Sequence, residues 1–173
     1  DHVVAGDIFQ VVLAQRYDLE LGADPFDVYR VLRQVNPSPY MFYYDFGDFH
    51  VVGASPEILV RKEGTTITLR PIAGTRPRGL DEVADAELKS ELRLNEKERA
   101  EHVMLVDLAR NDLGRVCETG SVEVAALCEP ESFPQVHHLT STVRGQLRQG
   151  LDGFDLLHAC FPGGSITGAP KLR

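Results

Sequence analysis

The sequence is short of positive charge and contains no long hydrophobic run. Eighteen lysines and arginines stand against 26 acidic residues, which gives a formal net charge of −8. Because nucleic-acid binding needs clustered basic residues in excess, this balance argues against a nucleic-acid partner. No stretch approaches the roughly 18 consecutive apolar residues of a membrane span, and the opening residues DHVVAGDIFQ lack the features of a signal peptide. We therefore expect a cytoplasmic protein without a membrane partner.

Cysteine is also scarce. Cys117, Cys128 and Cys160 are odd in number and widely spaced, with no C-x-x-C motif and no histidine pair at zinc spacing. This pattern predicts neither a disulfide framework nor a structural metal site. We expect the three side chains to be small buried hydrophobes.

What is present is an ordinary globular composition. The 173 residues are 43% hydrophobic and 25% charged, enough for about one domain with a sizeable core. There is no internal repeat and no low-complexity linker, so the chain is expected to form one continuous mixed α/β region.

Alternating apolar residues and glycine-containing turns predict two consecutive hairpins, over residues 41–53 and 57–72. Consecutive hairpins imply an antiparallel sheet. Asp152 is a plausible N-cap for a short helix. The predicted helices span 25–35, 81–94, 95–113 and 153–161, and the further strands span 121–127 and 138–147.

Two acidic residues, Glu98 and Glu101, lie three positions apart at the start of the predicted helix 95–113. Asn95 and Glu98 fit a capping-box pattern, so Glu98 can simply close the helix N-terminus. Glu101 lies further in, directly before the apolar run V-M-L-V. Two carboxylates on one helix face are also suited to Mg²⁺ if another acid joins them. The residues by themselves leave both interpretations open.

Seven motifs occur in order along almost the whole chain. They are GDIFQVVLAQR (6–16), NPSPYMFY (36–43), GASPE (53–57), RPIAGTRPRG (70–79), ERAEHVMLVDLARNDLGRV (98–116), VHHLTS (136–141) and FPGGSITGAPK (161–171). Together they resemble the chorismate-utilising enzymes, and most closely the large subunits of anthranilate synthase and aminodeoxychorismate synthase.

This resemblance implies an α/β (α+β) sandwich of large, mostly antiparallel sheets flanked by helices, with residues 1–173 as a partial catalytic domain truncated at both ends. It also implies a Mg²⁺-dependent lyase. Ammonia is added to chorismate at C2 and the C4 hydroxyl leaves; anthranilate synthases then eliminate pyruvate, which is a step of tryptophan biosynthesis.

The resemblance gives two residues catalytic roles. Glu57 matches the general acid that protonates the leaving hydroxyl, although by position alone it is an ordinary acid at a strand edge. His138 matches the active-site histidine, although a single histidine in a strand is more often structural. His137, one residue away, should face the opposite side of the strand.

The same resemblance implies that Glu98 and Glu101 are magnesium ligands, with the cation holding the ring carboxylate of chorismate. Gly74 and Thr75 match a loop that meets this carboxylate, and their alternative is plain turn chemistry. In the GGSITGAPK segment, Gly168 and Lys171 match a loop that offers backbone N–H groups and a cation to a substrate carboxylate. The P-loop spacing is absent, so a nucleotide site is not predicted.

Gln10 separates the amine-adding branches from the water-adding ones. Isochorismate and salicylate synthases usually carry a lysine at the matching place, whereas a glutamine side chain cannot act as a base. The nucleophile should therefore arrive as ammonia, which is similar to what a glutamine amidotransferase partner delivers.

The motifs disagree about the two amine-adding branches. Ala73 resembles anthranilate synthase, since aminodeoxychorismate synthases often carry a nucleophilic lysine there. FPQVHHL and FPGGSITGAPK are closer to aminodeoxychorismate synthase. We favour anthranilate synthase because Ala73 bears on the chemistry; a non-catalytic amino-acid-binding module of the same fold is a third alternative. The residues matching the tryptophan feedback pocket are Asn36, Pro37, Pro39, Tyr40 and Met41.

The family's domain continues past the GAPK motif to a late acidic helix with further magnesium ligands. We expect this chain alone to bind Mg²⁺ weakly and to lack measurable synthase activity. It should expose strand edges and apolar surface, which favours self-association.

Overall fold

The computed structural model describes residues 1–8, 10–169 and 171, which form two compact units. Unit 1 comprises Asp1–Val12 and Leu59–Arg173, and unit 2 comprises Leu13–Ile58. Unit 2 is thus inserted between two segments of unit 1. Whether both units belong to a single catalytic domain stays a prediction.

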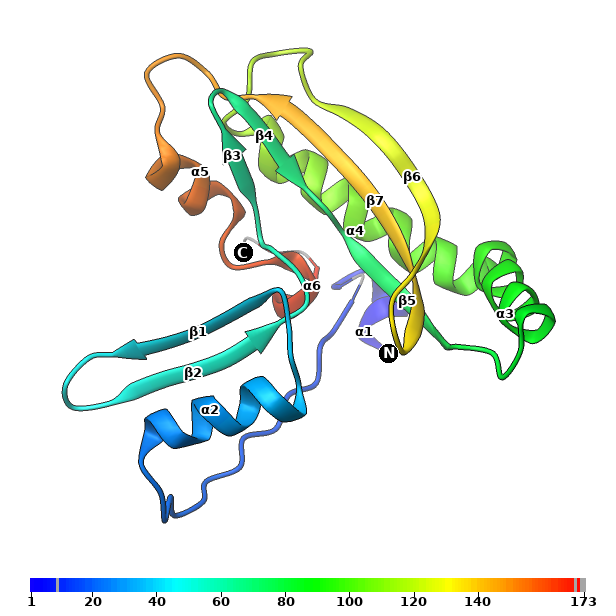
Figure 1. Cartoon of the computed structure of the whole chain (residues 1–173). Coiled ribbons are helices and arrows are strands. Elements are labelled where there is room, and N and C mark those ends of the chain that lie inside the picture. Colours follow the sequence, from blue (N-terminus) through cyan, green and yellow to red (C-terminus); the bar gives the residue numbers. More distant parts are fainter. Residues whose placement is uncertain (9, 170, 172–173) are drawn as a thin grey trace. The chain divides into compact units, whose positions relative to one another are not determined.

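Unit 1 is built on an antiparallel sheet centred on one strand (Figure 1). The strands are β3 (Arg61–Glu63), β4 (Thr66–Leu69), β5 (Ile72–Pro77), β6 (Glu123–Ser132) and β7 (Val136–Gln146). β4 and β5 pair with successive parts of β7. Val143 of β7 pairs with both Leu69 of β4 and Val124 of β6, so β6 lies along the other edge of β7.

Helices cover one face of this sheet. They are α3 (Glu82–Leu94) and α4 (Glu96–Gly114). α5 (Gly153–Cys160) and the single turn α6 (Gly164–Thr167) pack against α4, and the single turn α1 (His2–Ala5) begins the chain. α4 runs along β7 (Figure 1). Its Val106 and Leu113 pack in a core with Ile67 of β4 and Val143 of β7. The mixed α/β architecture and the antiparallel sheet confirm the predicted fold class.

Side chains of β7 alternate between the two faces of the sheet. The residues at odd positions from 137 to 145 are buried, whereas residues 138, 142, 144 and 146 are half-buried or exposed. His137 is therefore in the interior, where its Nε2 lies 2.9 Å from Asp85 Oδ1 of α3. His138 takes the other face, as the period of a strand predicts.

Unit 2 holds one helix and one hairpin: α2 (Pro25–Val35), β1 (Tyr40–Asp45) and β2 (His50–Ser55). Asp24 caps α2 by accepting a hydrogen bond from Phe26 N–H at 2.8 Å. The rings of Phe26 and Tyr43 meet edge to face, which seats the helix on the hairpin. No described residue of this unit is buried.

The structure corrects two predicted boundaries. The second hairpin ends at Leu69, and Ile72–Pro77 is the separate strand β5, shifted in register by a bulge between Ala73 and Thr75. β6 continues to Ser132, beyond the predicted end at 127. It does so through bulges around Cys128, which has a positive φ of 52°.

Two predictions from composition can be set beside the structure. The three cysteines are free and buried, as predicted. Within residues 1–8, 10–169 and 171, no helix is long and apolar enough to cross a bilayer.

Candidate functional site

Three elements of unit 1 bring four of the predicted residues together. Gly74 and Thr75 lie on β5, His138 on β7 and Glu98 in the first turn of α4. Thr75 is the register partner of His138. The Gly74–Thr75 segment contacts both other residues and is the centre of the group.

The imidazole of His138 is oriented by backbone and hydroxyl oxygens. Its Nδ1 lies 2.9 Å from Gly74 O and 3.1 Å from Thr75 Oγ1. A carbonyl oxygen only accepts hydrogen bonds, so this contact assigns the imidazole proton to Nδ1. In the neutral ring, Nε2 then carries the lone pair. Phe133 packs edge-on against the ring, with centroids 5.3 Å apart.

Gly74 has to be glycine for two reasons. Its φ is +65°, a backbone conformation that is costly for residues with a Cβ. A Cβ at this position would also lie 3.0 Å from Leu92 Cδ1 and 3.2 Å from Glu98 Oε2. The acid of α4 therefore approaches bare backbone, which keeps Glu98 next to the Gly74–Thr75 segment.

Glu98 serves the helix and faces the group at once. Asn95 caps α4 by accepting a hydrogen bond from Glu98 N–H at 3.1 Å, which confirms one half of the predicted capping box; the other half is not formed, because Asn95 N–H donates to Glu91 O at 2.9 Å. The Glu98 carboxylate, whose side chain is 20% exposed, is 3.3 Å from Arg76 Nη1. Arg76 also donates to Glu91 of α3. Hydrogen bonding to Glu91 raises the pKa of Arg76, and the same bond lowers the pKa of Glu91.

The magnesium site at Glu98 and Glu101 stays a prediction. Glu101 is about half exposed and lies 3.7 Å from Lys97 Nζ. Across the described ranges, no group of three or more His, Cys, Asp or Glu side chains could hold a metal ion. Glu98 and Glu101 supply hard oxygen donors of the type that Mg²⁺ prefers, but only two carboxylates of the six ligands an octahedral shell needs. Both carboxylates lie beside a basic side chain in this structure, Glu98 beside Arg76 and Glu101 beside Lys97, so they suit the ion only as oxygen donors of a partial ligand set.

Gln10 and Gly168 form a second group. Gln10 makes an isolated antiparallel bridge to Ala169, with N···O distances of 3.3 and 3.2 Å. Gly168 has a φ of +85°, and a Cβ there would lie 2.7 Å from Gln10 O. Gln10 Oε1 is buried and has no hydrogen-bond partner among the described residues.

Lys171 is occupied by structural contacts. Its Nζ lies 2.8 Å from Asp112 Oδ2, 2.7 Å from Cys160 O and 3.3 Å from Ala159 O. An ammonium group has three donors, so all three are used here. Asp112 is 14 residues after Glu98 on α4, about 21 Å along the helix axis at 1.5 Å per residue. This arrangement leaves Lys171 with no donor for a substrate carboxylate.

The remaining predicted residues belong to unit 2. Glu57 is half-buried directly after β2, and its backbone exchanges hydrogen bonds with Ser55 Oγ. The five residues assigned to a tryptophan-like pocket run from the C-cap of α2 to the start of β1. They are Asn36, Pro37, Pro39, Tyr40 and Met41. The hydroxyl of Ser38 bonds Ser55 O, which ties this segment to β2.

Sequence reasoning missed two partners of these residues. Arg76 was not assigned because the hairpin was expected to end at residue 72. Its place two residues after Gly74 becomes meaningful only once β5 is a strand. Asp112 lay inside the VDLARNDLGRV motif, and its charge within an apolar helix face was the available signal for a buried ion pair.

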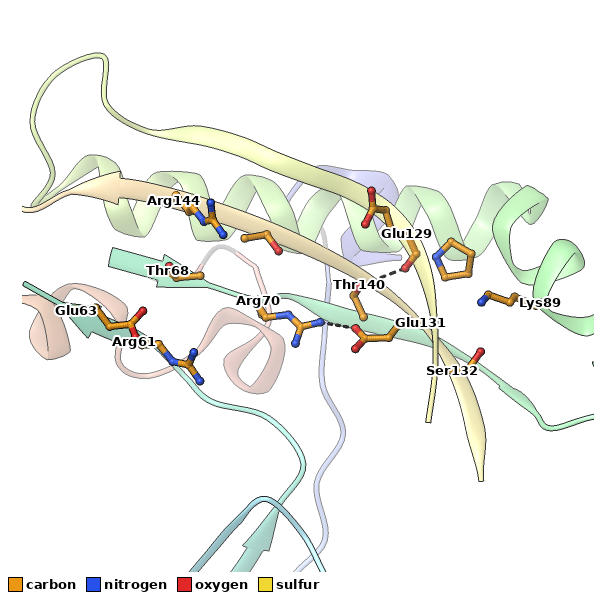
Figure 2. A pocket seen from close by; sticks show the side chains of 12 residues that line it. Arg61, Glu63, Thr68, Arg70, Lys89, Glu129, Glu131, Ser132, Thr140 and Arg144 are labelled. Carbon is orange, nitrogen blue, oxygen red and sulfur yellow. Dashed lines mark hydrogen bonds and ion pairs between the residues drawn. The ribbon is translucent and has the colours of Figure 1, made fainter. Parts of the chain in front are cut away.

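A polar pocket of about 550 Å³ lies on the sheet face away from α4 (Figure 2). Arg70, directly after β4, forms an ion pair with Glu131, and Thr140 Oγ1 donates to Glu129 O at 3.2 Å. None of the predicted site residues lines this pocket. Thr140 is, however, two positions after His138 on the same strand.

The whole chain, residues 1–173, matches the family model described as chorismate binding enzyme. The chain therefore belongs to this family. It is 56% identical to anthranilate synthase component 1 of Streptomyces coelicolor, over all of this chain and 34% of that protein. It is 52% identical to aminodeoxychorismate synthase component 1 of Bacillus subtilis, over 99% of this chain and 37% of that protein.

A solved structure of a family member is also similar to this chain. Anthranilate synthase component I from Streptococcus pneumoniae superposes with a TM-score of 0.86 at 48% identity, covering 98% of this chain and 37% of that one. The chain thus spans about a third of the length of its curated relatives. It is similar to both amine-adding branches.

Proposed function

We propose that these residues form the catalytic part of an anthranilate synthase large subunit, which converts chorismate and ammonia to anthranilate, pyruvate and water. The observation that carries this proposal is the group around Gly74–Thr75, in which His138 and Glu98 approach a glycine-built backbone segment. The similarity of the whole chain to anthranilate synthase component 1 of Streptomyces coelicolor supports the choice of reaction. The whole protein's activity is proposed, because this chain spans about a third of that relative.

The reaction needs an acid for a poor leaving group. In the proposed sequence, ammonia bonds to C2 of chorismate while the C4 hydroxyl takes a proton from Glu57 and leaves as water. A proton is then lost from C2 as the enolpyruvyl oxygen leaves C3, which makes the ring aromatic, and the released enolpyruvate takes up a proton at its methylene carbon to become pyruvate. His138 is the proposed acceptor of that proton, because its Nε2 holds the free lone pair when Nδ1 is bonded to Gly74 O.

The ring carboxylate of chorismate is held by Gly74 N–H and the Thr75 hydroxyl in this proposal. When bound, Mg²⁺ would neutralise that carboxylate electrostatically, with Glu98 and Glu101 as its protein ligands. Gln10 supplies no base, so the ammonia is proposed to come from a glutamine amidotransferase subunit. The site of the reaction is the cytoplasm.

Aminodeoxychorismate synthase is the second candidate. The 52% identity to component 1 of that enzyme from Bacillus subtilis favours it. The two candidates differ in where the amine ends and in whether pyruvate is released.

The test is an assay of the natural gene product that contains these residues, with chorismate, MgCl₂ and ammonium chloride. Anthranilate, identified by its fluorescence and retention time, together with one equivalent of pyruvate supports the proposal. Accumulation of aminodeoxychorismate without pyruvate favours the second candidate. Absence of any turnover, together with binding of an amino acid such as tryptophan, favours a non-catalytic module.

Two variants assign the acid. Glu57→Gln should lower kcat by about 10²- to 10⁴-fold, the usual contribution of a general acid. Glu63→Gln, at an exposed position of β3, is the matched control and should leave kcat unchanged. Equal kcat values for the two variants would remove Glu57 from the mechanism.

A further inference from the structure

Ser141 is the point at which the three elements of the candidate site are joined. Its backbone N–H donates to Pro71 O, at 3.1 Å, in the link between β4 and β5. Its hydroxyl Oγ lies 2.7 Å from Nε2 of His102 on α4. The same Oγ accepts a hydrogen bond from Cys128 N–H of β6 at 2.9 Å. The side chain of Ser141 therefore connects β7 to α4 and β6, and its backbone N–H connects β7 to the link before β5.

These connections are adjacent to the residues of the proposed reaction. Ser141 follows His138 by three residues on β7, and Pro71 precedes Gly74 by three on β5. His102 directly follows Glu101 and lies one helical turn after Glu98. A shift of any one element would move its functional side chain relative to the other two.

His102 is an unusual residue to find at this place. It is fully buried, and its Nδ1 has no hydrogen-bond partner among the described residues. Burial lowers the pKa of His102. The Ser141 hydroxyl accepts from Cys128 N–H and has its own proton available for the Nε2 lone pair. A position that served packing alone would be better filled by an apolar side chain, because a buried unpaired nitrogen is costly.

We propose that the His102–Ser141 hydrogen bond is the positioning element of the site, holding Glu98 and Glu101 of α4 in register with Gly74, Thr75 and His138. His102 and Ser141 are positioning residues and do not contact the substrate. This inference rests on the proposed function for its effect on turnover. Its effect on the hydrogen bonds of Ser141 can be measured without turnover.

The test uses the natural gene product with four substitutions. Ser141→Ala removes the hydroxyl, and His102→Asn is too short to reach Ser141. His102→Gln places an amide group near the position of Nε2 and retains the hydrogen bond. His158→Asn, at an exposed histidine of α5, is the matched control.

Three results are expected. Ser141→Ala and His102→Asn lower kcat for chorismate at least 10-fold, with KM changed less than 3-fold, while His102→Gln and His158→Asn stay within 3-fold of the unaltered protein. Mn²⁺ affinity stays within 3-fold in all four, because Glu98 and Glu101 lie on the same helix and keep their spacing. Amide exchange at Cys128, whose acceptor is Ser141 Oγ, becomes at least 10-fold faster in Ser141→Ala and His102→Asn.

Two results would overturn the proposal. If His102→Gln loses as much activity as His102→Asn, and Mn²⁺ affinity and melting temperature fall in parallel, the pair only stabilises the core. If kcat and Cys128 exchange are unchanged in all variants, the bond positions nothing. If the unaltered protein does not turn over chorismate, the proposed function fails. Amide exchange at Cys128 still decides whether the hydrogen bonds of Ser141 depend on His102.

Discussion

Unit 1 and unit 2 contain the same kinds of residues and bury them very differently. In unit 1, α4 and β7 enclose a core in which Ile67, Leu113 and Val143 are fully buried. In unit 2, α2 is amphipathic and yet contributes no buried residue, and its partner is a single two-stranded hairpin. A two-stranded hairpin is marginally stable by itself, and a helix that buries no residue adds little to it, whereas a sheet of more than two strands with a buried face is stable independently.

The difference bears directly on the candidate site. The residues grouped around Gly74 belong to the unit that has its own core, so their geometry follows from packing within this chain. Glu57 and the 36–41 segment belong to the unit without one. Substitutions matched across the two units test this contrast.

The largest effect is expected from the buried ion pair of unit 1. The side chains of Lys171 and Asp112 are 5% and 11% exposed, and burial raises the pKa of Asp112. Lys171→Met should cost about 3–5 kcal/mol of unfolding free energy, because it leaves a buried carboxylate unpaired. Arg30→Met, which breaks an exposed pair with Asp27 in unit 2, should cost less than about 0.5 kcal/mol.

Urea denaturation of the two variants measures both values. The double variant Lys171→Met with Asp112→Leu should regain most of the stability. A similar loss from Lys171→Met and Arg30→Met would contradict the assignment of Lys171 to the interior.

The next effect concerns apolar packing. Leu113→Ala removes a fully buried side chain of α4 and should cost about 2–5 kcal/mol. Val35→Ala, at a 73% exposed position of α2, should change stability by less than about 0.5 kcal/mol. Thermal denaturation followed by circular dichroism compares them. A large loss at Val35 would mean that this face of α2 is covered in solution.

A smaller effect is expected at two glycines. A Cβ at Gly79 would lie 2.1 Å from Asp85 N, so Gly79→Ala should force the start of α3 away from β5 and cost about 1–3 kcal/mol. A Cβ at Gly22 meets nothing within 4 Å. Gly22→Ala should be neutral or slightly stabilising, by up to about 1 kcal/mol. Differential scanning calorimetry measures both, and equal losses would refute the close approach at Gly79.

The smallest effect on stability is expected from lowering the pH. Asp85 accepts hydrogen bonds from Arg78, Gly79 N–H and His137, and the bond from Arg78 contributes most to lowering its pKa. A folded-state pKa below the unfolded value stabilises the fold above about pH 4, and this contribution is lost as the pH falls below that value. The urea midpoint should therefore drop between about pH 5 and pH 3.

Two variants check the source of that drop. Asp85→Asn should flatten the dependence of the urea midpoint on pH, because the titrating group is gone. Asp27→Asn, in unit 2, should leave the dependence as it is. An unchanged slope in Asp85→Asn would assign the acid sensitivity to other carboxylates of unit 1.

Local patterns predicted most of the helices and the hairpin turns. Helix 25–35 is confirmed at both ends, because Asp24 and Pro25 start it and Pro37 follows it. The period of two also placed His137 and His138 on opposite faces. These features depend on neighbours in sequence, so a sequence can reveal them.

The strands that contain poor strand-forming residues were harder to predict. β5 contains Gly74 at positive φ and ends at Pro77, both poor strand residues, and it is a strand because it pairs with β7. The last part of β6 includes Pro130 and lies beyond a bulge. For β5, pairing with β7 residues about 60 positions further along the chain overrides this low propensity, whereas the last part of β6 pairs with β7 residues 5 to 11 positions away.

The site residues were predictable to the same extent: residues within sequence motifs were identified, and pairs between separate elements were missed. Motif resemblance identified Gly74, Thr75, Glu98 and His138, and the structure groups them in unit 1. It gave no indication that Arg76 pairs with Glu98 or that Asp112 engages Lys171, because these pairs join separate elements. The roles of the grouped residues in catalysis stay predictions.

The bridge between Gln10 and Ala169 has a consequence for how the chain acquires its structure. It closes a loop of roughly 160 residues, and the entropy of closure makes such a contact one of the last to form. During synthesis, Gln10 leaves the ribosome long before its partner exists. The turn at Gly168, which rests against Gln10 O, is thus assembled only after the rest of unit 1 has folded, and hydrogen exchange should find it among the first parts to open.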